Sequence, residues 1–256
     1  MFICTSSSPT DMTRLSHTFF RHRWLISIAM LSQLAWSSTV SGRIEVSLAS
    51  KASRVRERSL SDIVVWLEPV HPATAVTVQP EHAQLLQKDK MFHPHTLVIT
   101  AGSTVDFPNA DPIFHNAFST FDGQIFDVGL YPPGTTESVR FRRPGIVRVF
   151  CNIHPSMSAI IVVVDTPYFT KADRDGRYQV PNVPPGRYEL HVFDERAETG
   201  PDSDVPVTVD EARAATTVPP VHLSEAGYVQ LSHKNKYGLD YAPSSTDPDT
   251  YTGPPK

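Results

Sequence analysis

The feature of this sequence that most constrains its fold is a pair of short apolar runs separated by a compact loop. Residues 146–150 and 159–164 are rich in β-branched side chains, which is typical of buried strands. The loop at 150–157 reads Phe-Cys-Asn-Ile-His-Pro-Ser-Met. The pattern predicts two neighbouring strands of one β-sheet, joined by this loop.

The loop carries three side chains that can bind a metal. Cys151, His154 and Met157 supply a thiol, an imidazole and a thioether, and a second imidazole, His115, follows the strand-like residues 104–107. One cysteine, two histidines and a methionine form the ligand set of a type 1, or blue, copper centre. Taken singly, each residue is more typical of core packing or of a surface position. The prediction of copper therefore rests on the four together.

Composition favours an all-β protein. The 256 residues suffice for one or two domains, and 23 prolines and 12 glycines break the apolar residues into short runs. The net charge of −4 gives no support for nucleic-acid binding.

Residues 1–37 resemble a cleaved signal peptide, with basic residues before an apolar run at 24–31 and a small-residue cleavage site at 35–37. A start at Met12 would make a more ordinary signal. A membrane anchor is the alternative, but the run is shorter than the roughly 20 residues that a span needs. We expect export to the periplasm and no membrane span after cleavage. Cys151 is then the sole cysteine, and a metal would protect its thiol in an oxidising compartment.

From about residue 78 to residue 166, apolar stretches and turn residues alternate. Residues 83–88, 96–99, 105–107 and 137–142 are predicted as strands, and 127–133 as a loop punctuated by glycine and proline. Antiparallel pairing of these strands would give a Greek-key sandwich of about eight strands.

This region resembles a cupredoxin of the amicyanin and plastocyanin type. The strand order, the His-Asn pair at 115–116 and the Cys-x-x-His-x-x-Met spacing carry the resemblance, and the segments 92–95 and 107–116 are similar to an exported bacterial family labelled methylamine utilisation proteins. The resemblance implies one copper ion held by four ligands, an Asn that hydrogen-bonds the thiolate and ties the two ligand loops together, and an apolar patch where electrons enter. In this sequence the ligands would be His115, Cys151, His154 and Met157, the Asn would be Asn116, and Pro155 and Phe114 would lie in the patch around His154.

Residues 172–192 contain two strands, each introduced by a glycine turn, and resemble a carboxypeptidase regulatory-like module, a small transthyretin-like β-sandwich. The opening strands of that module are similar to residues 42–69. We predict that 42–69 pair with 167–222 and that the cupredoxin is inserted between them; the alternative is two domains in tandem, with 42–69 in the cupredoxin. Asp173 and Asp175 are assigned to a β-turn, because a calcium loop needs more oxygen ligands.

The tail, 223–256, is poor in aliphatic residues and is predicted to be extended or disordered.

The leading functional hypothesis is a monomeric electron carrier, not an enzyme, that passes single electrons between redox proteins of the cytochrome or dehydrogenase class. The sequence shows no second copper cluster, protease triad or haem signature. Copper storage, delivery or sensing would use the same ligands and stays an alternative. A third possibility is an interaction protein with a degenerate cupredoxin, against which the intact ligands count.

Overall fold

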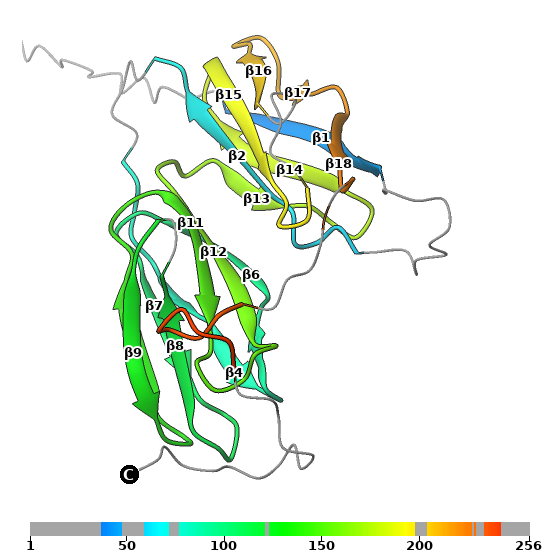
Figure 1. Ribbon diagram of the computed structural model, residues 1–256. Helices are drawn as coiled ribbons and strands as arrows, with labels where there is room; N and C mark the ends of the chain where they lie inside the picture. Colours follow the sequence, from blue (N-terminus) through cyan, green and yellow to red (C-terminus); the bar gives the residue numbers. More distant parts are fainter. Residues whose placement is uncertain are drawn as a thin grey trace, which may run out of the picture. The chain divides into compact units, whose positions relative to one another are not determined.

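The computed structural model contains strands and turns, and no helix, in the parts of the chain that it describes (Figure 1). These parts are residues 37–47, 59–71, 77–120, 123–197, 204–226, 228 and 233–241. The prediction of an all-β protein is confirmed. The signal peptide predicted at 1–37 lies outside the described residues except for Ser37, as does the tail beyond Tyr241.

Within the described ranges, no helix has the length and apolar character needed to cross a membrane.

One sandwich combines strands from residues 38–69 with strands from residues 169–224. Its first sheet has the order β14-β1-β17, with β18 also paired to β1, and its second has the order β13-β2-β15-β16. The strands are β1 (Ser38–Ser47), β2 (Val64–Pro69), β13 (Phe169–Lys171), β14 (Arg177–Val183), β15 (Gly186–Phe193), β16 (Asp204–Val209), β17 (Ala215–Thr217) and β18 (Val221–Ser224).

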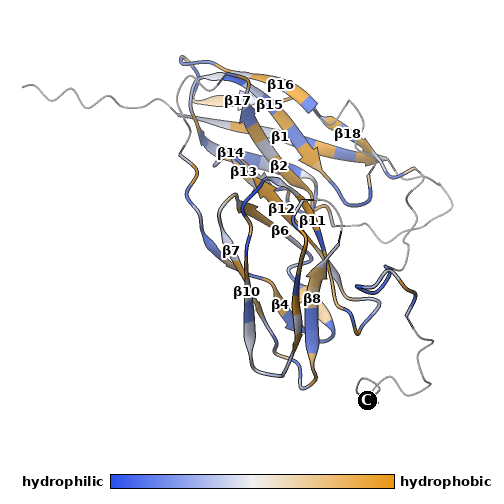
Figure 2. Cartoon of the chain, turned by 60° about the vertical axis from the view of Figure 1, so that its left-hand side comes forward, coloured by the Kyte–Doolittle hydropathy of each residue, from blue (hydrophilic) through white to orange (hydrophobic). Residues whose placement is uncertain are grey.

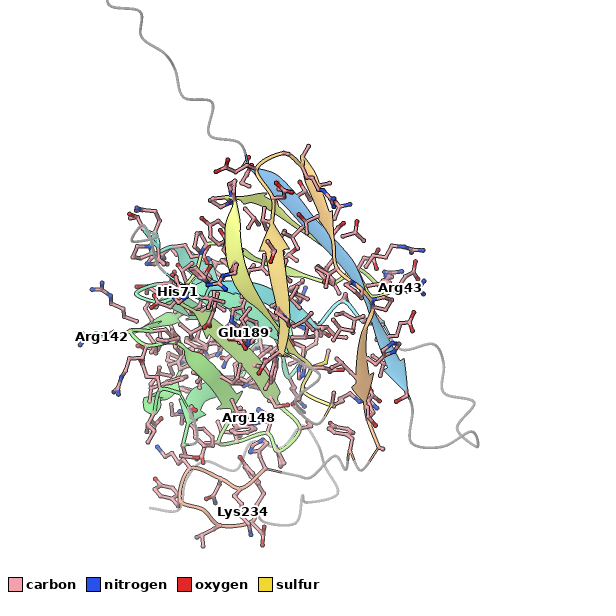
Figure 3. All side chains as sticks on the ribbon, turned by 90° about the horizontal axis from the view of Figure 1, so that it is seen from above. Arg43, His71, Arg142, Arg148, Glu189 and Lys234 are labelled. Carbon is pink, nitrogen blue, oxygen red and sulfur yellow. The ribbon has the colours of Figure 1, made fainter. Side chains whose placement is uncertain are left out.

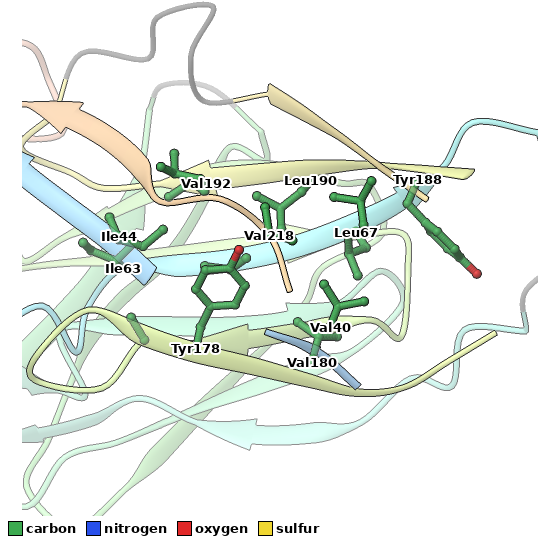
Figure 4. Packing of buried hydrophobic residues seen from close by; sticks show 14 of the residues in the cluster. Val40, Ile44, Ile63, Leu67, Tyr178, Val180, Tyr188, Leu190, Val192 and Val218 are labelled. Carbon is green, nitrogen blue, oxygen red and sulfur yellow. The ribbon is translucent and has the colours of Figure 1, made fainter. Parts of the chain in front are cut away.

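Strand β2 pairs antiparallel with β15, so that Trp66 lies opposite His191 and Leu67 opposite Leu190. This is the strand pairing that the inserted arrangement requires and the tandem arrangement lacks. Figure 4 shows the core between the two sheets, where Val40 and Ile44 of β1 and Leu67 of β2 belong to one buried cluster. The domain boundaries at 42–69, 78–166 and 167–222, and the regulatory-like identity of this sandwich, stay predictions.

The other sandwich holds the candidate metal ligands. Its larger sheet has the order β6-β12-β11-β8-β9, its smaller sheet the order β10-β7-β3, and β4 and β5 form a hairpin. The strands are β3 (His82–Gln84), β4 (Leu86–Lys88), β5 (Met91–His93), β6 (Thr96–Thr100), β7 (Thr104–Pro108), β8 (His115–Ser119), β9 (Phe126–Tyr131), β10 (Thr136–Arg140), β11 (Gly145–Phe150) and β12 (Ser158–Val164).

Strand β12 is buried on both faces, which explains why its apolar residues run without alternation (Figure 2). Ala159, Ile161 and Val163 belong to the core of the metal-site sandwich. The alternate residues Ile160, Val162 and Val164 join a second buried cluster with Val64 of β2 and Phe193 of β15.

The prediction of a loop at 127–133 is wrong for most of that range, because β9 occupies Phe126–Tyr131 and pairs with β8. The register shifts between Asn116 and Phe118, so β9 carries one extra residue, and Gly129 adopts a φ of 76° there. A glycine in this left-handed conformation is typical of a β-bulge. The glycine that indicated a loop therefore marks a bulge within a strand.

The β-turn predicted at Asp173 and Asp175 is confirmed. The Asp173 carboxylate accepts hydrogen bonds from the backbone N–H groups of Asp175 and Arg177, and the Gly176 N–H donates to the Asp173 carbonyl. Gly176 has a φ of 80°, and its own carbonyl accepts a hydrogen bond from the Ile44 N–H of β1. A Cβ at Gly176 would lie well inside contact distance of the Ile44 carbonyl oxygen.

We expect Gly176→Ala to lower the free energy of unfolding by about 2–5 kcal/mol, because it adds a steric conflict to the cost of a left-handed alanine. Gly134→Ala is the matched control: its φ is 74°, with no atom within 4 Å of an added Cβ, so it isolates the backbone cost of about 1–2 kcal/mol. Urea unfolding of both variants tests this. Equal losses of unfolding free energy in the two variants would show that the turn at Gly176 accommodates a Cβ at no additional cost.

Candidate metal centre

The loop that carries Cys151 is closed by the pairing of β11 with β12. Register pairs run from Gly145 and Val163 to Phe150 and Ser158, so residues 151–157 connect two adjacent strands. The Cys151 N–H donates to the Met157 carbonyl, and the Met157 N–H donates to the His154 carbonyl. These hydrogen bonds fold the loop back on itself and place Cys151 and His154 on one short turn.

His115 reaches the same place from β8, the neighbour of β11 in the sheet. The Cys151 Sγ atom lies 3.8 Å from His115 Nδ1 and 3.7 Å from His154 Nδ1. The three potential ligand atoms lie within 4.8 Å of one another, and the described residues contain no other group of this kind. The structure thus brings the imidazole of His115, which is distant in the sequence, next to the thiol and imidazole of the Cys151 loop.

These distances fit a transition metal bound between the three atoms. Metal–sulfur and metal–nitrogen bonds of roughly 2.3 and 2.1 Å, separated by a trigonal angle, place sulfur and nitrogen about 3.8 Å apart. The observed separations of 3.7 and 3.8 Å agree with that value. Thiolate and imidazole donors in a trigonal arrangement suit copper.

His115 is fully buried, and a carboxylate orients its ring. Its Nε2 atom lies 2.7 Å from Asp111 Oδ2, so the Nε2–H donates to Asp111 and the Nδ1 lone pair faces Cys151. Sequence reasoning missed Asp111. The sequence signal was an Asp four residues before His115. This spacing indicates a contact only when the chain between the two residues is known to turn.

Asp111 is itself held by the hairpin between β4 and β5. Its two carboxylate oxygens accept the backbone N–H groups of Asp89 and Lys90, at 2.7 and 2.9 Å. Both hairpin residues have a φ of 56°, which is unfavourable for side chains other than glycine. Burial raises the pKa of Asp111, but the hydrogen bonds from Lys90, His115 and Asp89 outweigh it and leave the pKa below its usual value. The carboxylate is therefore ionised and accepts all three donors.

Burial shifts the pKa values of the other two candidate ligands, Cys151 and His154. Burial raises the pKa of the Cys151 thiol, and backbone N–H groups of Ile153, Asn116 and His154 counteract part of that rise. Burial, together with His115 and Lys90, lowers the pKa of His154 to about 4. The His154 imidazole is thus neutral near pH 7, the form that binds metals.

Asn116 joins the strand that carries His115 to the loop that carries Cys151 and His154. Its Oδ1 accepts the Asn152 N–H at 3.3 Å, and its Nδ2 donates to Asp127 Oδ1 and to the Gly129 carbonyl. Its own carbonyl accepts a hydrogen bond from the buried Gln87 side chain. The bulge at Gly129 therefore shapes the strand that holds Asn116 in place.

The remaining residues predicted for the site lie around the three donors. Met157 is fully buried in the same core cluster as Cys151. His154 is partly exposed, Pro155 is exposed, and Phe114 has 38% of its surface exposed. A role of Met157 as axial ligand, and of Phe114 and Pro155 in a patch, stays a prediction.

Comparison with known proteins gives one curated relative. No family model matches the chain. The methylamine utilization protein MauL of Methylorubrum extorquens is 40% identical over 55 residues, which make up 21% of this chain and 48% of that protein. The chain thus spans about half the length of the curated relative that it matches.

The similar solved structures include two cupredoxins and one larger copper protein. A purple cupredoxin from Nitrosopumilus maritimus is 23% identical, covers 32% of this chain and 99% of its own, and has a TM-score of 0.30. Amicyanin from Paracoccus versutus is 16% identical over 38% of this chain and 97% of its own, with a TM-score of 0.30. A copper-containing nitrite reductase from Thermus scotoductus is 28% identical over 38% of this chain and 25% of its own, with a TM-score of 0.31.

Asp111→Asn should weaken copper binding by roughly 10- to 100-fold, since the partner of a ligand imidazole orients it and raises its basicity. Competition with a chromophoric chelator measures the affinity. Asp106→Asn is the matched control, because Asp106 lies in the same sandwich and contacts a different histidine, the exposed His82, at 3.3 Å. If the two variants bind copper equally well, Asp111 does not act on the site.

Proposed function

We propose that this chain is an exported type 1 copper protein that carries single electrons between periplasmic redox proteins. The observation that carries the proposal is the cluster formed by the Sγ of buried Cys151 and the Nδ1 atoms of His115 and His154, at separations that suit one metal ion. These three residues would hold the copper, with Met157 as a weak axial ligand. When bound, copper supplies a one-electron couple between Cu(II) and Cu(I).

The protein's own contribution is to keep the donors in one arrangement. Cys151 and Met157 are packed in the sandwich core, and Asp111 fixes the ring of His115. Close-packed interiors and fully paired buried polar groups resist displacement. An electron can then arrive and leave with little movement of the ligands, and no covalent bond of the protein is made or broken.

The partners would meet the protein at His154. This residue is partly exposed, Pro155 follows it directly in the sequence, and Phe114 precedes His115; both Pro155 and Phe114 offer exposed apolar surface. We propose redox proteins of the cytochrome or dehydrogenase class as donor and acceptor. The name of the MauL relative, a methylamine utilization protein, supports a role in methylamine utilization.

In this proposal a cupredoxin domain, residues 78–166, is inserted into a carboxypeptidase regulatory-like sandwich formed by 42–69 and 167–222. The pairing of β2 with β15 supports the insertion. The mature protein would be a periplasmic monomer that transfers electrons without catalysing a reaction of its own.

The test is to load the purified mature protein with Cu(II) and to record its visible and EPR spectra. We expect an intense thiolate-to-copper band with a small hyperfine splitting, and its loss in Cys151→Ser, because the band requires the thiolate. A band that persists in Cys151→Ser would show that the ligands are misassigned. A colourless protein that retains only Cu(I) would favour storage, delivery or sensing instead.

Met157→Leu should keep the blue colour and raise the reduction potential, because removal of a weak axial donor destabilises Cu(II) more than Cu(I). Spectroelectrochemical titration measures the potential. An unchanged potential would mean that Met157 packs in the core without contacting the copper.

A further inference from the structure

A C-terminal segment, residues 233–241, lies against the outside of the loop that carries Cys151 (red in Figure 1). The His233 ring stacks on Phe150, with centroids 4.3 Å apart and planes inclined by 25°. The Tyr241 hydroxyl lies 2.9 Å from the Cys151 carbonyl oxygen, to which it donates, and 3.2 Å from His233 Nδ1. These residues belong to the tail that the sequence predicts to be extended or disordered; they form no strand, and they contact the Cys151 loop.

The segment also completes a closed ring of hydrogen bonds beside the ligands. The Lys236 N–H donates to Asn152 Oδ1 at 2.9 Å, and the Lys236 ammonium pairs with Asp127 Oδ2 at 2.7 Å. Asp127 Oδ1 accepts from Asn116 Nδ2, and Asn116 Oδ1 accepts from the Asn152 N–H. Lys236 thus joins the Cys151 loop to Asp127 of β9. Asp127 in turn is hydrogen-bonded to Asn116, the residue next to His115.

Hydrogen bonds within residues 233–241 order the segment as a turn. The Asn235 side chain accepts the N–H groups of Tyr237 and Leu239, and the Asn235 N–H donates to the Leu239 carbonyl. Lys234, labelled in Figure 3, pairs with Asp240 within the same turn. A turn that is ordered by its own hydrogen bonds loses less conformational entropy when it packs against the loop.

We propose that residues 233–241 form a C-terminal strap that positions the copper-binding loop and keeps it closed. Tyr241 and Lys236 act as positioning residues, the first through the carbonyl of a ligand and the second through Asn152 and Asp127. The Cys151 carbonyl and the Asn152 side chain lie outside the β11–β12 pairing, and the strap donates a hydrogen bond to each. Opening of the loop therefore requires the loss of these two hydrogen bonds. The role in copper binding rests on the proposed function, whereas the closure of the loop does not.

The strap is tested first in the metal-free protein, by the rate at which a thiol reagent modifies Cys151. Cys151 is fully buried, so this rate reports opening of the loop. Loss of the Tyr241 hydroxyl in Tyr241→Phe should raise the rate roughly 2- to 10-fold, the equivalent of one hydrogen bond. A chain that ends at residue 232 lacks the whole strap and should react faster still.

The parent protein and Tyr188→Phe serve as controls and should react at the same rate. Tyr188→Phe removes a tyrosine hydroxyl that donates to a carbonyl, that of Pro184, in the other sandwich. Thermal unfolding checks that every variant is folded. If Tyr241→Phe is folded and reacts at the parent rate, the strap does not hold the loop, whatever the shortened chain does.

The copper-loaded protein provides a second measurement. Transfer of copper to a competing chelator should be several-fold faster in Tyr241→Phe than in the controls, and the hyperfine splitting of its EPR spectrum should change. An unchanged transfer rate and spectrum would overturn the role of the strap in copper binding. Failure of the parent protein to form the blue site would overturn the proposed function instead, and the thiol measurement would still decide whether the strap closes the loop.

Discussion

The antiparallel pairing of β11 with β12 is the constraint on which the candidate site depends. Its register sets Phe150 opposite Ser158, so the residues between them have to reverse direction within one short loop. The backbone hydrogen bonds of the sheet fix both ends of this loop, and β8 lies beside β11 and brings His115 to it. The donor atoms of Cys151 and His154 therefore gain their positions from backbone pairing, before any metal contributes.

Around this loop, several buried polar groups are held in place by hydrogen bonds to one another. Asp111 orients His115 and is held by the β4–β5 hairpin, while the Tyr131 hydroxyl donates to Gln87, whose side chain donates to the Asn116 carbonyl. Buried polar groups are costly unless they are paired, so such a network has few alternative arrangements. The cost of unpaired buried groups therefore makes the positions of the three clustered donor atoms specific.

Two features of the structure differ from what the sequence predicts or are not specified by it. Glycine punctuates loops far more often than it marks bulges, so Gly129 predicts a loop, and only the register of β8 against β9 distinguishes the two. The individual contacts of the strap cannot be predicted because they are made by single hydroxyl, amide and ammonium groups. Such contacts leave no periodic pattern of apolar residues by which a sequence could indicate them.

The sequence by itself determined the β-class, the apolar strands on both sides of the loop and the identity of the three clustered donors, because these follow from local residue type and spacing. Only the tertiary structure decided that β12 is buried on both faces, and that Asp111 and Tyr241 contact His115 and Cys151. These features depend on pairing between segments distant in sequence. Local patterns carry no record of that pairing.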